Sequence, residues 1–343
     1  MRTHSKTSTS LIASVVAAGV LVSMPVAGLG ANDAWTVPRT ADGRPDFQGV
    51  WANNGATPLE RPEEWADKES LTREELESLK EAALRATNGG EDALFGDQLI
   101  RAAIANEKAT SYDPGTGNYN QFWVSVRTFD NRTSLIVDPP DGRIPALTEE
   151  ATAHFEAAAE HRKAHPANSY TDRRLSERCI SYGVPRLGAG YNAYYKISQN
   201  ADHVVILMEM IHDARVIPID SQALLDGSIR LWHGDSRGHW EGDTLVIETK
   251  NYSKKSGFRG SSENLHVTER LTLVGPNTLN YVVTIEDPDT WTAPWTVMIP
   301  LKETGEEIFE YACHEGNYGM EGILAGHRAK EREMTAQTAT GSE

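Results

Sequence analysis

The sequence predicts a mainly β protein whose antiparallel strands close into a barrel. Between residues 192 and 314, short segments rich in β-branched and aromatic residues follow one another. Turn-forming stretches such as "QNAD", "GPN" and "KETG" separate these segments. No helical pattern lies between them, which excludes parallel strands joined by helical crossovers. A closed up-and-down barrel protects the edges of so many strands, and a two-sheet sandwich is the alternative.

The first strand is expected around Phe47, Val50 and Trp51, in the stretch "DFQGVWAN". Alternating apolar residues over positions 121–137, with a turn at Asp130 and Asn131, predict a hairpin. The later strands follow as a meander. They are expected at residues 192–199, 202–211, 215–220, 229–233, 238–240, 244–250, 266–274, 278–286, 295–301 and 307–314.

Helices are expected as an insertion near the start of the chain and before the meander. Thr72 and Glu75 form a capping-box pattern that predicts a helix over residues 72–87, and a second helix is expected over 92–108. Thr148 is a candidate N-cap for a third helix over 148–164. Residues 331–343 lack apolar spacing and are expected to form a flexible tail. We therefore expect one domain over residues 32–330.

Residues 1–31 have the pattern of a secretory signal peptide. Arg2, His4 and Lys6 give a basic start, residues 11–29 are almost free of charge, and small residues precede Asn32. An uncleaved membrane anchor is the alternative, but Pro25 and several glycines interrupt the run. The pattern predicts a periplasmic or secreted protein with no membrane insertion after signal cleavage.

Two cysteines, Cys179 and Cys313, are expected to form a disulfide in an oxidising compartment. The alternative is a nucleophilic thiolate beside His314, which the opposite facing of adjacent strand residues disfavours.

The formal net charge of -16 narrows the class of partner. An excess of carboxylates repels nucleic-acid phosphates and anionic lipid surfaces. We therefore expect a small-molecule substrate or ligand that is neutral or cationic, and no nucleic acid.

Two resemblances extend this interpretation. "GVW" at residues 49–51 resembles the Gly-x-Trp opening of lipocalin-like (calycin) barrels, in which an apolar cavity holds a small ligand. "GRPDFQGVWAN", "HGDSRGHWEGDTLVIETKNY" and "YACHEGNYGMEGIL" together resemble a large family of exported bacterial proteins without an assigned activity. This second resemblance covers residues 43–328. It implies export and a single fold, and it transfers no catalytic residue.

The stretch "ILMEMIHDAR", residues 206–215, places a carboxylate in an apolar run. In a continuous strand, period two puts Glu209, Asp213 and Arg215 on one face, with Glu209 flanked by apolar neighbours. Arg215 would then lie roughly 20 Å from Glu209 at about 3.3 Å per residue, too far to pair with it unless the chain bends. A partner for Glu209 is therefore expected from another strand.

A buried carboxylate either has its pKa raised by desolvation, as a general acid or base requires, or is held ionised by a cation. The first state makes Glu209 the candidate catalytic residue, with His212 as its counterpart, Arg215 positioning an anionic group, and His314 at the end of the last strand. The alternative is a structural ion pair inside the barrel. Candidate ligand-binding residues are Tyr194, Tyr195, His233, His239, Glu269, Glu315 and Asn317.

These residues favour an exported enzyme that performs cofactor-independent acid-base chemistry of the lyase, isomerase, hydratase or cyclase type. The chain lacks GxSxG, HExxH, GxGxxG, Walker and CxxC motifs. His161 and His165 have a spacing that can bind zinc, but a solvated helix face is the favoured interpretation, so neither a metal nor a cofactor is expected. The alternatives are a lipocalin-like carrier of an apolar or aromatic ligand, a structural module, or a glycoside hydrolase with paired carboxylates.

Overall fold

The computed structural model describes residues 35–87, 92–108, 120, 124, 126–220, 223–256 and 258–340. The expected signal peptide lies outside these residues. The chain divides into two units, Met1–Thr36 and Val37–Glu343, and the described helices and strands all belong to the second unit. In the described part of the chain, no helix has the length and apolar character to cross a bilayer.

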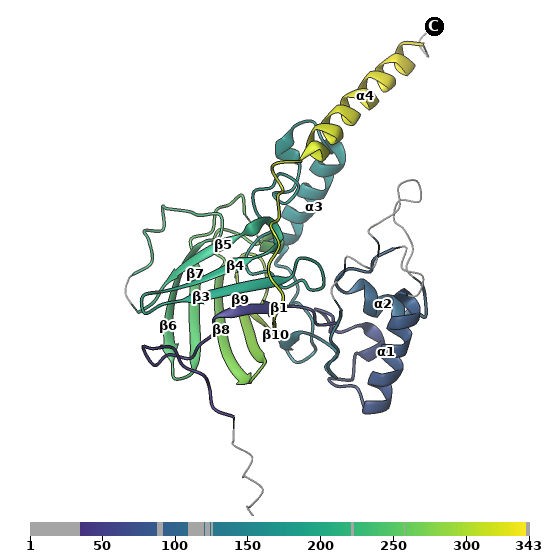
Figure 1. Cartoon of the computed structure of the whole chain (residues 1–343). Coiled ribbons are helices and arrows are strands. Elements are labelled where there is room, and N and C mark those ends of the chain that lie inside the picture. Colours follow the sequence, from purple (N-terminus) through teal and green to yellow (C-terminus); the bar gives the residue numbers. More distant parts are fainter. Residues whose placement is uncertain are drawn as a thin grey trace, which may run out of the picture. The chain divides into compact units, whose positions relative to one another are not determined.

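The described residues form a mainly β fold in which nine antiparallel strands make a nearly closed barrel (Figure 1). Their spatial order is β5-β4-β3-β1-β10-β9-β8-β7-β6, and β2 also pairs with β10. Apart from β2 and the break between β5 and β6, each strand pairs with the next in sequence, and β1 pairs with β10, which is the up-and-down arrangement. The strands are β1 (Gly49–Ala52), β2 (Ile136–Asp138), β3 (Tyr194–Gln199), β4 (His203–Met208), β5 (Ala214–Pro218), β6 (Asp235–Glu241), β7 (Thr244–Lys250), β8 (His266–Gly275), β9 (Thr278–Glu286) and β10 (Trp295–Thr304).

The gap in the barrel falls between β5 and β6, and strand number explains why. In a ring of alternating antiparallel strands, an odd number forces one neighbouring pair to run parallel. The parallel pair here is a single bridge between Ile219 and Gly238. A Cβ at Gly238 would lie 2.5 Å from Ile219 Cδ1, so glycine is what allows the two strands to approach. The seam is therefore held mainly by close packing.

Period-two alternation gives the barrel its apolar interior. In β8, β9 and β10, buried and partly exposed residues alternate along the strand. The inward side chains include Val283, Trp295 and Val297, each 0% exposed. Two charged residues, Arg215 and Glu269, also point into this interior and are 6% and 0% exposed.

Some predicted strands are absent or shorter. The strand predicted over 202–211 ends at Met208, because the chain reverses immediately afterwards. Residues 229–233 form only one isolated bridge, and their apolar side chains have no buried face: Trp232 is 40% exposed. Residues 307–314 form no strand either, and Phe309 is 75% exposed. The predicted hairpin over 121–137 is wrong for its second arm, which pairs with β10; residues 121–123 and 125 lie outside the described part.

The helices lie largely where the sequence places them. Thr72 and Glu75 exchange the two hydrogen bonds of a capping box at the start of the first helix. The expected flexible tail is helical up to residue 340, because it consists of good helix formers although it has no apolar stripe. The helices are α1 (Arg73–Thr87), α2 (Gln98–Ala105), α3 (Glu149–Ala164) and α4 (Tyr318–Thr340).

Candidate functional site

The candidate site is built around the turn that joins β4 to β5. Ile206 and Arg215 are partners across these two strands, so the chain between them folds back on itself. Ile211 and His212 make this reversal with positive φ angles of 56° and 45°. The prediction that Glu209 and Arg215 share one face of a continuous strand is therefore wrong.

Glu209 occupies the first position of this turn and is 3% exposed. The backbone N–H of Phe309 donates to Glu209 Oε1 at 3.3 Å, whereas Oε2 is buried and has no hydrogen-bond partner in the described part of the chain. Burial raises the pKa of the Glu209 carboxyl, although the Phe309 N–H, the nearby Asn192 amide and Arg186 each act to lower it. The carboxyl is thus shifted toward its protonated form.

Glu209 lines a cavity of about 390 Å³, which we call the turn pocket. One wall consists of residues 207–209 and His212, and the other of residues 308–312 and Glu315. The pocket brings together three residues that the sequence singles out: Glu209, His212 and Glu315. It does not include His314, Arg215 or Glu269.

His212 is exposed, and one hydrogen bond joins its ring to the opposite wall. Its Nδ1 lies 3.0 Å from the carbonyl oxygen of Tyr311. A carbonyl oxygen can only accept a hydrogen bond, so in the neutral ring Nδ1 carries the hydrogen and Nε2 keeps its lone pair. His212 therefore has the tautomer that a base acting through Nε2 requires.

Backbone strain is concentrated around this pocket. Ile211 and His212 form the turn, Asn192 lies close enough to Glu209 to affect its pKa, and Cys179 is bonded to Cys313 of the pocket segment. All four have positive φ without being glycine. Such conformations are costly for side chains with a Cβ, most of all for a β-branched residue, and they gather at functional sites.

Arg215 forms a buried ion pair with Glu269 in the barrel interior. Its NH1 and NH2 groups donate to Glu269 Oε1 and Oε2 at 2.8 and 2.6 Å, and NH2 also donates to Ser236 and Thr249. Tyr281 donates to Glu269 Oε1 at 2.6 Å. The space beside this network is only about 10 Å³. The structure therefore gives Arg215 a bracing position in the barrel interior, where NH1 and NH2 are bonded and the buried Nε has no hydrogen-bond partner in the described part of the chain.

Two further predicted residues lie near the turn pocket without lining it. Tyr194 donates its hydroxyl to Glu306 at 2.9 Å, and Tyr195 is buried and donates to the carbonyl of Arg186 at 2.8 Å. His314 is exposed and lies in an irregular segment, so its predicted position at the end of a strand is wrong.

The side chain of Asn317, in the segment after His314, contacts other residues of the protein. Its side chain donates to the carbonyl of Glu177 at 2.9 Å and contacts Cys179 Sγ. His239 is exposed and lies 3.2 Å from Glu241.

The predicted ligand-binding residue His233 lies in a cluster with Ser181 and Asp213, and sequence reasoning missed this grouping. Ser181 Oγ lies 2.9 Å from His233 Nε2 and 3.1 Å from Asp213 Oδ2. Asp213 Oδ1 lies 3.2 Å from the same Nε2. A catalytic triad needs the acid and the serine on opposite ring nitrogens, so this cluster is not one. Instead, Asp213 ties the Ser181 loop to the β4–β5 turn, since it also accepts the N–H of Tyr182 at 3.0 Å.

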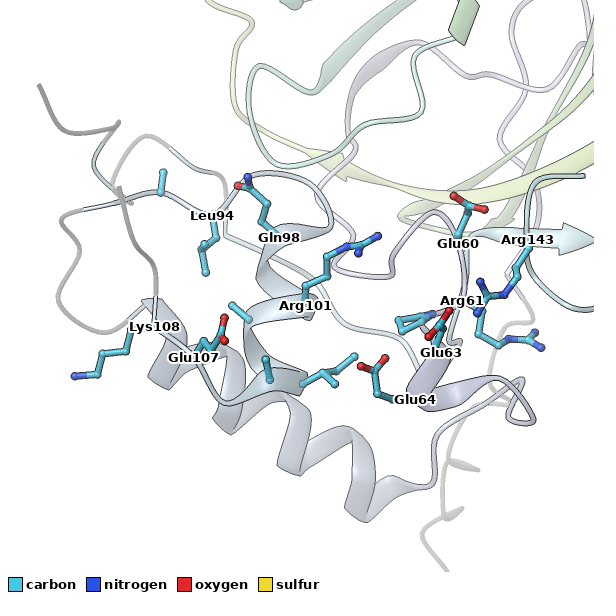
Figure 2. A pocket seen from close by; sticks show the side chains of 15 residues that line it. Glu60, Arg61, Glu63, Glu64, Leu94, Gln98, Arg101, Glu107, Lys108 and Arg143 are labelled. Carbon is cyan, nitrogen blue, oxygen red and sulfur yellow. The ribbon is translucent and has the colours of Figure 1, made fainter. Parts of the chain in front are cut away.

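A larger pocket of about 630 Å³ lies beside α2 (Figure 2). None of the residues that the sequence predicts to be functional lines it. Its charged lining residues balance, with four acidic and four basic side chains. Its charged residues are Glu60, Glu63, Glu64, Glu107, Arg61, Arg101, Lys108 and Arg143.

Glu209→Gln tests the raised pKa directly. The folded state binds the Glu209 proton more tightly than the unfolded state, so the stability that this group contributes is present at low pH. It is lost as the pH rises from the unfolded pKa through the folded one. Glutamine keeps an acceptor for Phe309 but carries no charge. Glu209→Gln should therefore equal the wild type in free energy of unfolding at about pH 4 and exceed it at about pH 8, by about 1.4 kcal/mol per unit of pKa difference.

Urea unfolding at the two pH values measures this difference. Glu307→Gln, a change at an exposed carboxyl of the neighbouring segment, is the matched control and should show no pH-dependent gain. An equal gain in both variants would contradict a raised pKa at Glu209.

In the described residues, no three His, Cys, Asp or Glu side chains are grouped so as to hold a metal ion. Comparison with known proteins adds no assignment: no protein-family model, curated protein or solved structure matches this chain.

Proposed function

We propose that the chain is an exported enzyme that performs cofactor-independent acid-base chemistry, of lyase or isomerase type, on a small molecule held in the turn pocket. The observation that carries the proposal is a buried carboxyl with a raised pKa that shares a pocket with a histidine hydrogen-bonded to the opposite wall. The Cys179–Cys313 disulfide and the expected signal peptide support export. Membership of the family of exported bacterial proteins would agree with this proposal.

In the proposed reaction, His212 Nε2 takes a proton from a carbon atom of the substrate, while Glu209 donates its proton elsewhere. When the acceptor is a hydroxyl oxygen, the C–H and C–O bonds break, a C=C bond forms and water leaves. When the acceptor is another carbon, the product is an isomer. Both reactions leave the oxidation balance unchanged, and the acid and base are reset by exchange of one proton through solvent.

Two alternatives make different use of the same pocket. The pocket beside Arg215 in the barrel interior has room for about one water molecule, whereas the turn pocket measures about 390 Å³, so a carrier is expected to use the turn pocket as well. Glu315 lines the pocket with Glu209, which makes hydrolysis by paired carboxylates the second candidate. A glycosidase needs Glu315 and not His212, so the effects of His212→Gln and Glu315→Gln distinguish the two reactions.

The experiment is turnover in D2O. Bacterial small-molecule extracts are incubated with wild-type protein, and mass spectrometry identifies compounds that are consumed, isomers that gain one deuterium, and elimination products that have lost water and carry no added deuterium. Glu209→Gln and His212→Gln should each lower the rate by about 10²- to 10⁴-fold, because each removes one proton-transfer group. Glu307→Gln should retain the wild-type rate. Wild-type rates in Glu209→Gln and His212→Gln, or a ligand bound but never converted, would overturn the proposal.

A further inference from the structure

We propose that the substrate of the turn pocket is a small apolar or aromatic molecule with one positively charged amine group. This inference rests on the proposed function and names the substrate class for the same site. It depends on three features of the pocket: carboxylates without an ion pair in the described part of the chain, a buried acid with an unpartnered oxygen, and two aromatic rings, one exposed and one half-buried.

The outer wall of the pocket is acidic. Glu310 and Glu315 line it, both are exposed, and neither forms an ion pair with a described residue. Residues 303–315 contain five glutamates and neither lysine nor arginine. The whole chain carries a formal net charge of -16, so the long-range field also attracts cations. These charges favour an ammonium group over a carboxylate or phosphate.

The inner wall supplies an independent indication of a ligand. Glu209 is 3% exposed and lines the same pocket, and its Oε2 has no hydrogen-bond partner in the described part of the chain. A buried polar atom without a partner is costly, and a hydrogen-bonding group of a bound molecule would satisfy it. The pocket thus has an unpartnered polar atom at its base as well as negative charge at its mouth.

Aromatic and aliphatic side chains in the pocket lining indicate that most of the ligand is apolar. Phe309 and Tyr311 line the pocket from one wall and Leu207 from the other. Phe309 is 75% exposed, an unusual position for a large apolar side chain. Aromatic rings attract organic cations through their π faces and pack against apolar ligands. An amine attached to a ring or a short aliphatic body meets both requirements.

The cation that acts on Glu209 lies outside the lining of the turn pocket. This cation is Arg186, and its guanidinium donates to the carbonyl oxygens of Asn192 and Tyr191. Arg186 therefore does not compete for the space of the ligand.

The test uses three probes of similar shape and different charge: benzylammonium, benzyl alcohol and benzoate. Each is titrated into the full chain at neutral pH and followed by NMR shifts of the Phe309 and Tyr311 rings. Benzylammonium should bind about tenfold more tightly than benzyl alcohol, and benzoate should bind most weakly. The preference for benzylammonium should decrease in about 1 M salt, because the carboxylates at the mouth are exposed.

Matched variants identify the groups responsible. The double variant Glu310→Gln/Glu315→Gln should weaken benzylammonium binding severalfold and leave benzyl alcohol unchanged. Glu307→Gln removes one charge from the same segment but outside the pocket lining, and should leave the affinity for both probes near that of the wild type. All three positions are exposed, so the variants should fold.

The possible results separate the two proposals. If benzyl alcohol or benzoate binds as tightly as benzylammonium, or if Glu307→Gln has the effect of the double variant, the amine assignment is overturned while acid-base turnover stands. If none of the probes shifts the two rings while D2O turnover persists, the amine assignment falls and the reaction occurs elsewhere. Weak, charge-independent binding together with no turnover overturns both.

Discussion

Arg215→Met is expected to lower the free energy of unfolding by about 3–5 kcal/mol, because it leaves the Glu269 carboxylate buried without its cation. Arg215 and Glu269 are 6% and 0% exposed and form a two-pronged contact at 2.6 and 2.8 Å. After the change, the only remaining hydrogen bond to Glu269 in the described side chains comes from Tyr281. Urea unfolding at neutral pH, followed by circular dichroism, measures the loss.

The double variant Arg215→Met/Glu269→Leu tests whether the pair acts as a brace. Replacing both partners by apolar side chains of similar volume removes the desolvation cost as well as the attraction, so most of the lost stability should return. Turnover in the double variant should stay near that of the wild type, because neither residue lines the turn pocket. A double variant as unstable as Arg215→Met, or a single variant that loses under about 1 kcal/mol, would contradict the brace.

Where the sequence pattern was regular, it predicted the fold well. Strands β7 and β9 have the predicted bounds of 244–250 and 278–286, because period-two alternation and clear turns define both of their ends. The predicted up-and-down barrel is confirmed, as is the Cys179–Cys313 disulfide. The strands depend on local sequence pattern, and the disulfide is the one pairing that two cysteines can form.

The β4–β5 turn could not be predicted because its sequence contains none of the usual signals. Positive φ normally calls for glycine or asparagine, but Ile211 and His212 adopt it here. The strand predicted over residues 229–233 is wrong for the opposite reason. Their β propensity is high, but no neighbouring strand covers them, and propensity in a strand largely reflects packing against neighbours.

The candidate site was only partly accessible from sequence. An apolar run around Glu209 indicated its burial, and the structure places His212 and Glu315 in the same pocket. The opposite wall, with Phe309 and Tyr311, comes from a segment 100 residues farther along the chain. No spacing rule predicts which irregular segment packs on a given turn. The catalytic roles of these residues stay predictions.

Removing the disulfide with Cys179→Ala/Cys313→Ala is expected to cost up to about 5 kcal/mol. The two cysteines are 134 residues apart, and cross-linking so long a loop strongly restricts the unfolded chain in the chain-entropy model. Their Cα atoms are 5.6 Å apart, an ordinary distance for a disulfide. Guanidinium unfolding of the variant and of the oxidised wild type measures the difference.

The measured loss in free energy of unfolding should be smaller than about 5 kcal/mol, because the folded state also changes when the disulfide is removed. The segment after β10 pairs with no strand of the described part of the chain. The disulfide holds it to Cys179, and contacts from Glu209 and His212 hold it to the β4–β5 turn. Without the disulfide, the folded variant gains local conformational entropy. This gain partly offsets the conformational entropy that the unfolded chain gains. Hydrogen exchange of the Phe309 amide should therefore quicken in the variant, whereas amides of β9 should change only as global stability does. Unchanged exchange at Phe309, with a loss of the full amount of about 5 kcal/mol, would mean that the two side-chain contacts alone hold this wall of the pocket.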